Sequence, residues 1–459
     1  MMTGAEYRAS LADGRQIFFE GQRVADLAAH PILGPAVDTV ARCYDRFHAP
    51  GRGEGPLMGV PRSAADLKAR IPLLHEADLV AHVTYQSIMT LTTAANRIGG
   101  ESPLYAERMA RYVAEVQRKD LRVTECITDA KGDRSLAPGK QPDADAYTRV
   151  VERRADGVVI RGAKLHISGA ALGHELMVIP TKAMKPGEDD YAIACAVPVN
   201  AKGVKIVSTS YAPRHADTRD FPISSRHNCP EGFVIFDEVF VPNERIFLNG
   251  EVKHAAVFAH SLGLWERLGS LSFLADEADQ LVGFAQLIAE ANGLAQVAHI
   301  REKISEMIIH ATLVRAALEA AIGNCNFGAD GAAYPDELYT NAGKYQGAAN
   351  YNAMVRHLHD IAGGSVLTAP AIADLENNEI GPLVRKYMAG ANSDGEYRMK
   401  LFHAIRDLTA DAYGGWKFVT NIQAGGGLYA QRIVTRKHYD LEGAKQKALK
   451  LAGMAEGAH

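Results

Sequence analysis

Several short stretches combine glycine with charged side chains in a way that suits an anionic ligand. Lys131, Gly132, Asp133 and Arg134 follow a predicted strand. A turn of this kind presents backbone N–H groups, and the guanidinium of Arg134 offers a rigid fork for a diphosphate. From the residues alone, a charged surface turn is the simpler interpretation, and phosphate binding stays open as the alternative.

Two glycine-rich loops follow helix-like segments. Their residues are Ala362, Gly363 and Gly364 in the first loop and Ala424, Gly425, Gly426 and Gly427 in the second. Glycine permits close backbone approach and positive φ, so main-chain N–H groups could meet a dinucleotide. A helix cap is the commoner use of such glycines. Neither loop has the strand–GxGxxG–helix context of a dinucleotide-binding unit, so a bound nicotinamide is not expected.

A metal site is not predicted. Asp78 and His82 are spaced to share one helix face. With His299 or Glu266 they could hold a metal ion, but an exposed helix pair is the favoured interpretation.

Composition and charge exclude some classes of function. The formal net charge is -4, which gives no basic footprint for nucleic acid or for an anionic membrane. The five cysteines form no CxxC pair, and their odd number favours a reduced, cytoplasmic protein. The stretch from Met1 to Gly21 has charges throughout and no apolar core, so no signal peptide is expected. No apolar run approaches the ~18 residues of a spanning helix.

The pattern of apolar, β-branched and turn-forming residues along the chain predicts three regions. These regions would position the candidate site residues. Residues 1–120 are expected to be helical, with helices over 38–47, 81–97 and 105–120. Residues 121–250 are rich in β-branched residues and predict strands, including a hairpin around Asp156. Residues 251–459 return to a helical period. One apolar helix face there comprises Ile300, Ile304, Met307, Ala311, Val314, Leu318 and Ile322.

An ordered set of motifs resembles the 4-hydroxyphenylacetate 3-monooxygenase family. The motifs are YRASLADGRQIFFEGQRV (7–24), DLRVTECITDAKGDRS (120–135), RGAKLHISGAALGHE (161–175), FVIFDEVFVPNERIFL (233–248), DIAGGSVLTAP (360–370) and AGGGLYAQRI (424–433). Each motif alone is weak, whereas the set in this order covers almost the whole chain. The resemblance implies an α+β, acyl-CoA-dehydrogenase-like fold with an N-terminal helical domain, a middle β-barrel and a C-terminal helix bundle. It also implies a homotetramer that uses FAD.

The resemblance assigns roles to particular residues. Glu125 stands where the hydroxylases place a histidine beside the phenol oxygen, and with His166 it is the candidate catalytic group. A carboxylate can act as a general base, but it donates to a phenolate only when protonated. A buried structural partnership of Glu125 with Arg122 or Arg134 is the alternative. A core histidine is the alternative for His166.

Other residues are expected to hold the cofactor or the substrate. Tyr85, Gln86 and Ser87 are expected to face the substrate. Flavin contacts are expected from Glu125, Cys126, Ile127, Lys131, Gly132, Asp133, Arg134, Ser168 and the two glycine loops.

Two branches of the family are relevant to the reaction. Two-component hydroxylases take reduced FAD from a separate NAD(P)H-flavin reductase and form a flavin C4a-peroxide. The 4-hydroxybutyryl-CoA dehydratases carry FAD and a 4Fe-4S cluster, which needs thiolate ligands. The corresponding segments here, 75–87 and 261–277, contain no cysteine. The leading hypothesis is therefore a monooxygenase of a small aromatic or cyclic substrate. A cluster-free dehydratase or isomerase of an acyl-CoA is the second, and a non-catalytic flavin-storing or scaffolding homologue is the third.

Overall fold

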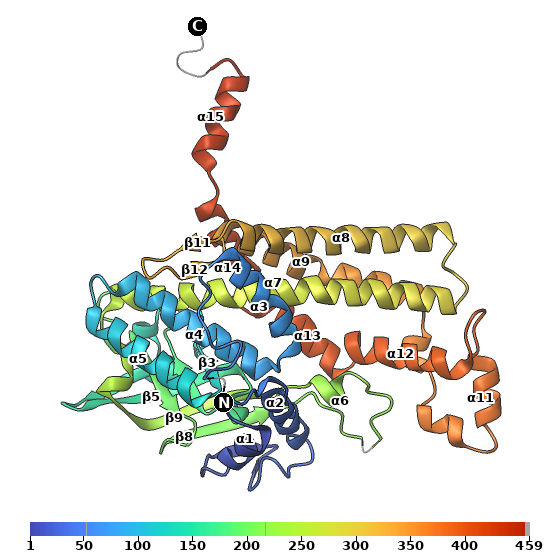
Figure 1. Ribbon diagram of the computed structural model, residues 1–459, viewed down its shortest axis with the longest axis horizontal. Coiled ribbons are helices and arrows are strands. Elements are labelled where there is room, and N and C mark those ends of the chain that lie inside the picture. Colours follow the sequence, from blue (N-terminus) through green and yellow to red (C-terminus); the bar gives the residue numbers. More distant parts are fainter. Residues whose placement is uncertain (52, 216, 455–459) are drawn as a thin grey trace.

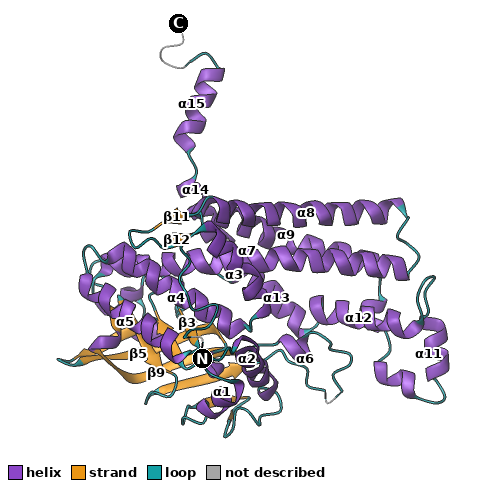
Figure 2. Cartoon of the chain, in the orientation of Figure 1, coloured by secondary structure: helices purple, strands orange, loops and turns teal. Residues whose placement is uncertain are grey.

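The elements follow one another in the order that the sequence predicts: helices, then strands, then helices (Figures 1 and 2). The computed structural model describes residues 1–51, 53–215 and 217–454. The N-terminal part contains α1 (Gly4–Ser10), β1 (Ile17–Phe19), β2 (Gln22–Arg23), α2 (Gly34–Phe47), α3 (Ala64–Glu76), α4 (Leu79–Ile98) and α5 (Pro103–Lys119). Helix α5 ends at Asp120, which adopts a left-handed conformation with φ 53°.

The middle part, expected as a β-barrel, consists of two sheets, and the described strands do not close into a single barrel. Its elements are β3 (Val123–Cys126), β4 (Arg149–Arg153), β5 (Gly157–Ser168), β6 (Glu175–Val178), β7 (Ile193–Pro198), β8 (Val204–Thr209), α6 (Ser224–His227), β9 (Glu231–Pro242) and β10 (Ile246–Asn249). One sheet has the order β2-β1-β8-β9-β5-β4 and the other β10-β7-β6-β3. Strand β1 comes from the N-terminal part and pairs in parallel with β8.

The local β predictions are confirmed. Strands β4 and β5 form an antiparallel hairpin around Asp156. Strand β3, which carries Glu125, pairs in parallel with β6, and Glu125 is opposite Met177. Beyond β3, the backbone is bonded to β5, where the Leu165 N–H donates to the Thr128 carbonyl at 2.7 Å. These pairings fix the segment after β3 against the end of β5.

Long helices form the C-terminal part. The first three run side by side: α7 (Val252–Ala291), α8 (Ala298–Gly323) and α9 (Glu337–Ala362) (Figure 1). The remaining elements are β11 (Asn326–Phe327), β12 (Ala333–Tyr334), α10 (Ser365–Thr368), α11 (Gly381–Met388), α12 (Gly395–Thr409), α13 (Ala412–Gln423), α14 (Leu428–His438) and α15 (Leu441–Leu451). All seven residues of the apolar face predicted for α8 are buried, so that prediction is confirmed.

Helix α4 connects the parts, because it packs against α7 of the bundle and against β3 of the smaller sheet. Fifteen of its 20 residues are buried. Boundaries near residues 120 and 250 remain our proposal for the domain limits; they coincide with the links α5–β3 and β10–α7. Among the described residues, no helix is both long enough and apolar enough to cross a bilayer.

Candidate functional site

Helix α4 carries polar side chains into the interior where it meets α7. His82 and Gln86 lie one turn apart on α4, and both are buried. They face Gly269 of α7, where a Cβ atom would collide with His82 and lie 2.7 Å from Gln86 Nε2. The missing side chain lets the helices approach closely. The approach brings Gln86 to the stretch of α7 one turn earlier, where its Nε2 donates to the Trp265 carbonyl at 3.5 Å, next to Glu266.

Glu125 lies on β3, which also packs against α4. We call the meeting place of α4, α7 and β3 the junction. The Oε1 atom of Glu125 is inaccessible to solvent and has no hydrogen-bond partner. Burial raises the pKa of Glu125 well above its ordinary value, and the charge of Glu266 raises it further. Burial also raises the pKa of Glu266, against the opposing effects of Lys344 and Gln86. The junction therefore holds a pair of interacting acidic groups at the contact of the sheet with the bundle.

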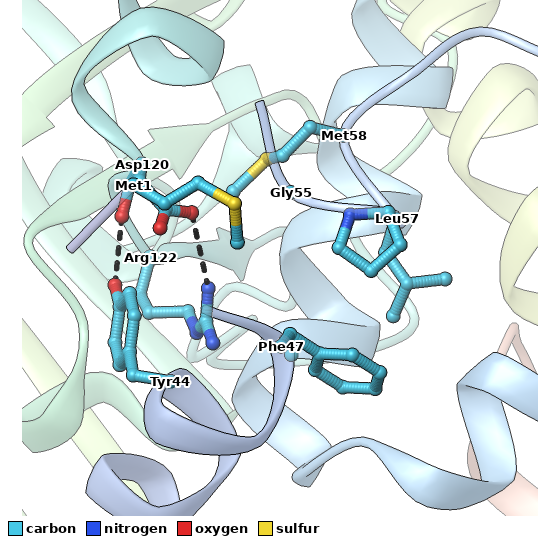
Figure 3. A pocket seen from close by; sticks show the side chains of 10 residues that line it. Met1, Tyr44, Phe47, Gly55, Leu57, Met58, Asp120 and Arg122 are labelled. Carbon is cyan, nitrogen blue, oxygen red and sulfur yellow. Dashed lines mark hydrogen bonds and ion pairs between the residues drawn. The ribbon is translucent and has the colours of Figure 1, made fainter. Parts of the chain in front are cut away.

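The alternative pairing of Glu125 with Arg122 is not formed, because Arg122 is engaged elsewhere (Figure 3). Its guanidinium lies 3.6 Å from Asp78 and 3.9 Å from Asp120, and it stacks 3.9 Å from the ring centroid of Tyr44. The Tyr44 hydroxyl donates to the Asp120 carbonyl at 2.7 Å. Tyr44, Asp120 and Arg122 line a small pocket beside Met58. Together with Asp78, Arg122 and Asp120 form a structural charge cluster at the start of α4.

Asp78 and His82 are not the exposed helix pair that was expected, since both are buried. Asp78 caps α4, with Oδ1 accepting from the Ala81 N–H at 2.9 Å. Burial lowers the pKa of His82 to about 3, and His75 adds to this effect, so the imidazole is neutral. Within the described chain, no group of three or more His, Cys, Asp or Glu side chains is arranged to hold a metal ion.

Tyr85, Gln86 and Ser87 are all buried, but they point in different directions because successive helical residues are separated by about 100°. Tyr85 packs edge-on against Trp265, and its hydroxyl has no partner. The Ser87 hydroxyl donates to the Val83 carbonyl of its own helix at 2.9 Å. Of the three, Gln86 is the residue whose side chain donates to α7, at the Trp265 carbonyl next to Glu266.

The loop of Ala424, Gly425, Gly426 and Gly427 lies against the same stretch of α7. The Arg267 Nε donates to the Gly425 carbonyl at 2.8 Å. Gly425 has φ 70°, and a Cβ there would lie 2.8 Å from Arg267 Cγ and 3.2 Å from Glu266 Cγ. Glycine is therefore required both by the backbone conformation and by the close approach. The structure thus brings this loop to Glu266, as the sequence could not show.

The other glycine loop ends α9. Ala362 is the last residue of the helix, and Gly363 is its cap with φ 81°. A Cβ on Gly363 or Gly364 would meet no atom of the described residues within 4 Å. A helix cap accounts for the positive φ at Gly363. Any need for a small residue at Gly364 must come from a ligand or a second copy.

The turn after β3 is rigid and carries cations. Lys131 and Gly132 both have positive φ, and the Asp133 N–H donates to Gln141 Oε1 at 2.9 Å. Lys131 is partly buried, and burial together with the charge of Arg134 lowers its pKa. Within the described residues, neither Lys131 nor Arg134 forms an ion pair. Two such cations in one turn fit a diphosphate.

Cys126 and Ile127 have few groups available to a ligand. The Cys126 side chain is fully buried in the core between the sheets, and burial raises the pKa of its thiol. The Ile127 carbonyl accepts from Lys164 Nζ at 2.9 Å and from the Thr181 hydroxyl at 2.6 Å.

The end of β5 presents His166 and Ser168. His166 is exposed and has φ 60° at an irregularity of the β5–β9 pairing, so its interpretation as a core histidine is wrong. Such a bulge re-aims a side chain. The Ser168 hydroxyl donates to Glu231, 3.0 Å from each carboxylate oxygen, and Trp416 Nε1 donates to the same group at 2.9 Å. Burial raises the pKa of Glu231, against these two hydrogen bonds.

Sequence reasoning missed three charged groups that the fold brings to this region: Glu266 in the role found here, Glu231 and Lys344. Glu266 and Arg267 interrupt a stretch of α7 that otherwise carries no charge, SLGLWERLGSLSFL, and charges in such a stretch were the available signal. Lys344 is fully buried on α9 and donates to the Asn421 carbonyl. Burial lowers the pKa of Lys344 to about 8, against the effects of Glu266 and Glu277.

Family models match almost the entire chain. The 4-hydroxyphenylacetate 3-hydroxylase N-terminal model matches residues 3–248, and the C-terminal model of the same family matches residues 255–453. The chain belongs to the 4-hydroxyphenylacetate 3-hydroxylase family. The carboxyl pair therefore joins the two matched parts, with Glu125 from the first and Glu266 from the second.

Relatives within the family differ in their reactions. The chain is 27% identical to the 4-hydroxybutyryl-CoA dehydratase/vinylacetyl-CoA-Delta-isomerase of Clostridium aminobutyricum, over 99% of this chain and 100% of the relative. It is 25% identical to an FADH(2)-dependent monooxygenase of Burkholderia cepacia, over 97% and 90% of the two chains. The structure of an oxygen-tolerant 4-hydroxybutyryl-CoA dehydratase from N. maritimus superposes with a TM-score of 0.89 at 26% identity, covering 100% and 96%. The expected order of N-terminal helices, a middle β part and a C-terminal helix bundle is confirmed.

Proposed function

We propose that this protein is the oxygenase component of a two-component system, which hydroxylates a small aromatic or cyclic substrate with reduced FAD. The observation that carries the proposal is the polar junction of Glu125, Gln86, Glu266 and the 424–427 loop in a chain matched almost throughout by hydroxylase-family models. The junction places an acid–base group in a largely buried setting. Similarity to an FADH(2)-dependent monooxygenase supports the same class of reaction.

The residues present fit FAD. Lys131 and Arg134 would hold its diphosphate, while Ser168, Ala362–Gly364 and the loop of Ala424–Gly427 would contact the remainder. Reduced FAD would supply the electrons that activate oxygen. A separate NAD(P)H-flavin reductase would deliver it. The chain's own residues would bind and orient the substrate, exclude water from the junction and hold a proton on Glu125 near the substrate oxygen.

Part of the surface supports assembly into the expected homotetramer. Helix α15 has no buried residue and stands away from the body of the chain (Figure 1). A single helix of this length is marginal in water by itself, so packing against another copy would stabilise it. Exposed apolar residues on the bundle extend the surface that assembly would cover: Ile308, Ile309, Leu313, Val419, Tyr429 and Ile433. All five cysteines are free, in keeping with our placement of the enzyme in the cytoplasm.

The test of the reaction uses isotopic oxygen. The purified protein is mixed with chemically reduced FAD, a panel of phenols and ¹⁸O₂, and the products are analysed by mass spectrometry. We expect ¹⁸O in a hydroxylated product, with NADH supporting turnover only after a flavin reductase is added. Conversion of none of the phenols, together with oxygen-independent dehydration of a 4-hydroxyacyl-CoA, would contradict the proposal.

An acyl-CoA dehydratase or isomerase is the second candidate, favoured by the full-length similarity to the enzyme of Clostridium aminobutyricum. The donor set of the described chain does not fit a 4Fe-4S cluster, since no three candidate ligands gather at one place. In this alternative, Glu125 would remove a proton from the acyl group beside oxidised FAD.

The turn after β3 gives a prediction about FAD affinity. Lys131→Met and Arg134→Gln should each weaken FAD binding about ten-fold, because each removes a charge-assisted hydrogen bond to phosphate. Equilibrium titration of FAD fluorescence measures this change. The matched control is Lys205→Met, which removes an exposed lysine paired with Asp237 on the neighbouring strand. Unchanged affinity in both turn variants would mean that 131–134 is only a charged surface turn.

A further inference from the structure

Ser168, Glu231 and Trp416 form a hydrogen-bonded cluster where the β part meets the C-terminal bundle. Glu231 of β9 is directly opposite Ser168, the last residue of β5, in the antiparallel register. Side chains in such a position lie on the same face of the sheet. The Ser168 hydroxyl donates to the Glu231 carboxylate, 3.0 Å from each oxygen, and Trp416 Nε1 of α13 donates to Oε1 at 2.9 Å. The strand register and the docking of α13 together set this geometry.

Aromatic neighbours fix the indole of Trp416 in this position. The ring of Tyr211 stacks on Trp416 with centroids 4.5 Å apart, and the ring of Tyr413 lies 5.5 Å away. Tyr211 is itself held, because its hydroxyl donates to the Cys229 carbonyl at 2.6 Å and accepts from the Cys229 N–H at 3.1 Å. An indole N–H can only donate, so Glu231 Oε1 is committed as its acceptor.

The cluster also fixes the direction of the Ser168 hydroxyl. A serine hydroxyl has one hydrogen and two lone pairs, and an ionised carboxylate can only accept. The hydrogen of Ser168 is therefore used by Glu231, and toward a ligand Ser168 can only accept. Because Ser168 is only partly buried, its lone pairs can meet a ligand.

We propose that Glu231 makes Ser168 an acceptor for the N5–H group of reduced FAD, and that the pair thereby favours the reduced cofactor over the oxidised one. The isoalloxazine N5 carries a hydrogen when FAD is reduced, whereas in oxidised FAD it is an acceptor and would face the lone pairs of Ser168. The inference rests on the proposed function, in which Ser168 contacts FAD and a reductase delivers it reduced. Glu231 acts through Ser168 and is a positioning residue.

The variant Glu231→Gln reverses the hydroxyl while keeping the size of the side chain. The amide oxygen has to accept from Trp416, so the amide N–H₂ faces Ser168 Oγ and donates to it. The hydroxyl hydrogen of Ser168 is then free for the ligand, which favours oxidised FAD. Loss of the negative charge alone would have the opposite effect, because it stabilises the more electron-rich reduced form. The sign of the change therefore separates the two explanations.

Spectroelectrochemical titration of FAD bound to the purified protein measures this preference without turnover. In Glu231→Gln, the affinity for reduced FAD relative to oxidised FAD should fall about ten-fold, as expected for one hydrogen bond. This change lowers the midpoint potential by about 30 mV for a two-electron couple. Ser168→Ala should lower the midpoint by less, since it removes the acceptor without supplying a donor. A merely structural weakening of the site would reduce both affinities alike and leave the midpoint in place.

A double variant tests whether Glu231 acts through the hydroxyl. In the Ser168→Ala background, Glu231→Gln should give no further fall, because the group that it orients is gone. The matched control is Thr209→Val, which removes a hydroxyl from β8, the strand on the other side of Glu231, and should leave the midpoint unchanged.

The inference is overturned if the midpoint rises or stays unchanged in Glu231→Gln, stays unchanged in Ser168→Ala, or falls equally when Glu231→Gln is added to Ser168→Ala. Each of these results can occur with phenols still hydroxylated, which leaves the proposed function intact. A fall in Glu231→Gln that requires Ser168, in a protein that gives no ¹⁸O-labelled product, would support the inference and overturn the proposed function.

Discussion

Replacing Glu125 by glutamine is expected to lower the turnover number about 100-fold, within the usual contribution of a general acid or base. The amide keeps the size of the side chain and can still donate an N–H to a substrate oxygen, so KM should change little. It cannot transfer a proton. Glu125→Leu removes the donor as well and should weaken substrate binding in addition. Steady-state kinetics with reduced FAD supplied in excess separate the two effects.

The controls distinguish chemistry from folding. Glu152→Gln changes an exposed glutamate paired with Arg154 and should leave kcat and KM unchanged. FAD affinity should be similar in all these variants, because the proposed diphosphate contacts lie at Lys131 and Arg134. Wild-type turnover in Glu125→Gln would show that Glu125 is not catalytic. Loss of the folded state would show instead that the carboxyl group is structural.

The pH dependence of protein stability gives an independent check of the raised pKa of Glu125. Its pKa is raised in the folded protein, so the folded state holds this proton more tightly than the unfolded chain does. The corresponding stabilisation is complete below the ordinary pKa of a glutamate and is lost as the pH rises from that value toward the raised pKa. Glu125→Gln lacks this dependence, so its melting temperature relative to wild type should increase with pH across that window.

Replacing Glu277 by glutamine is expected to destabilise the C-terminal bundle by about 3–5 kcal/mol, the usual cost of breaking a buried ion pair. Glu277 of α7 is 5% exposed; it pairs with Lys417 and accepts from Asn421 Nδ2 at 2.8 Å. Burial alone would lower the pKa of Lys417, but Glu277 outweighs that effect and raises it. The variant therefore leaves a charged Lys417 without its partner. Tryptophan fluorescence during urea unfolding reports this change, because both tryptophans, Trp265 and Trp416, lie in the bundle.

A double variant makes this test sharper. Glu277→Gln with Lys417→Met removes both charges, and replacement of a buried pair by apolar groups is often close to neutral. It should recover most of the lost stability. The surface control is Glu396→Gln, whose partners Arg385 and Lys400 are exposed, and its effect should stay within about 1 kcal/mol. A loss in Glu277→Gln no larger than in this control would contradict the importance of the buried pair.

Patterns that depend on neighbouring residues were readable in the sequence. The apolar spacing from Ile300 to Ile322 predicts α8, and the turn around Asp156 predicts the β4–β5 hairpin, because helices and hairpins impose periods of about 3.6 and 2 residues on the chain itself. The order of motifs indicated the family. The sheets were harder: β1 joins β8 across a long stretch of chain, so local patterns did not reveal that the strands form two sheets rather than a single closed barrel.

The candidate site depended on the tertiary structure for a different reason. The sequence singled out Glu125 and Gln86, but it gave no sign that α7 would bring Glu266 and Arg267 to them or that Gly425 would pack on the same turn. The protonation of a carboxyl group depends on nearby charges and on its exclusion from water. Both quantities are set by the packing of α4, α7 and β3. The residue types were therefore determined by the sequence, whereas the charge that each one carries was decided by the fold.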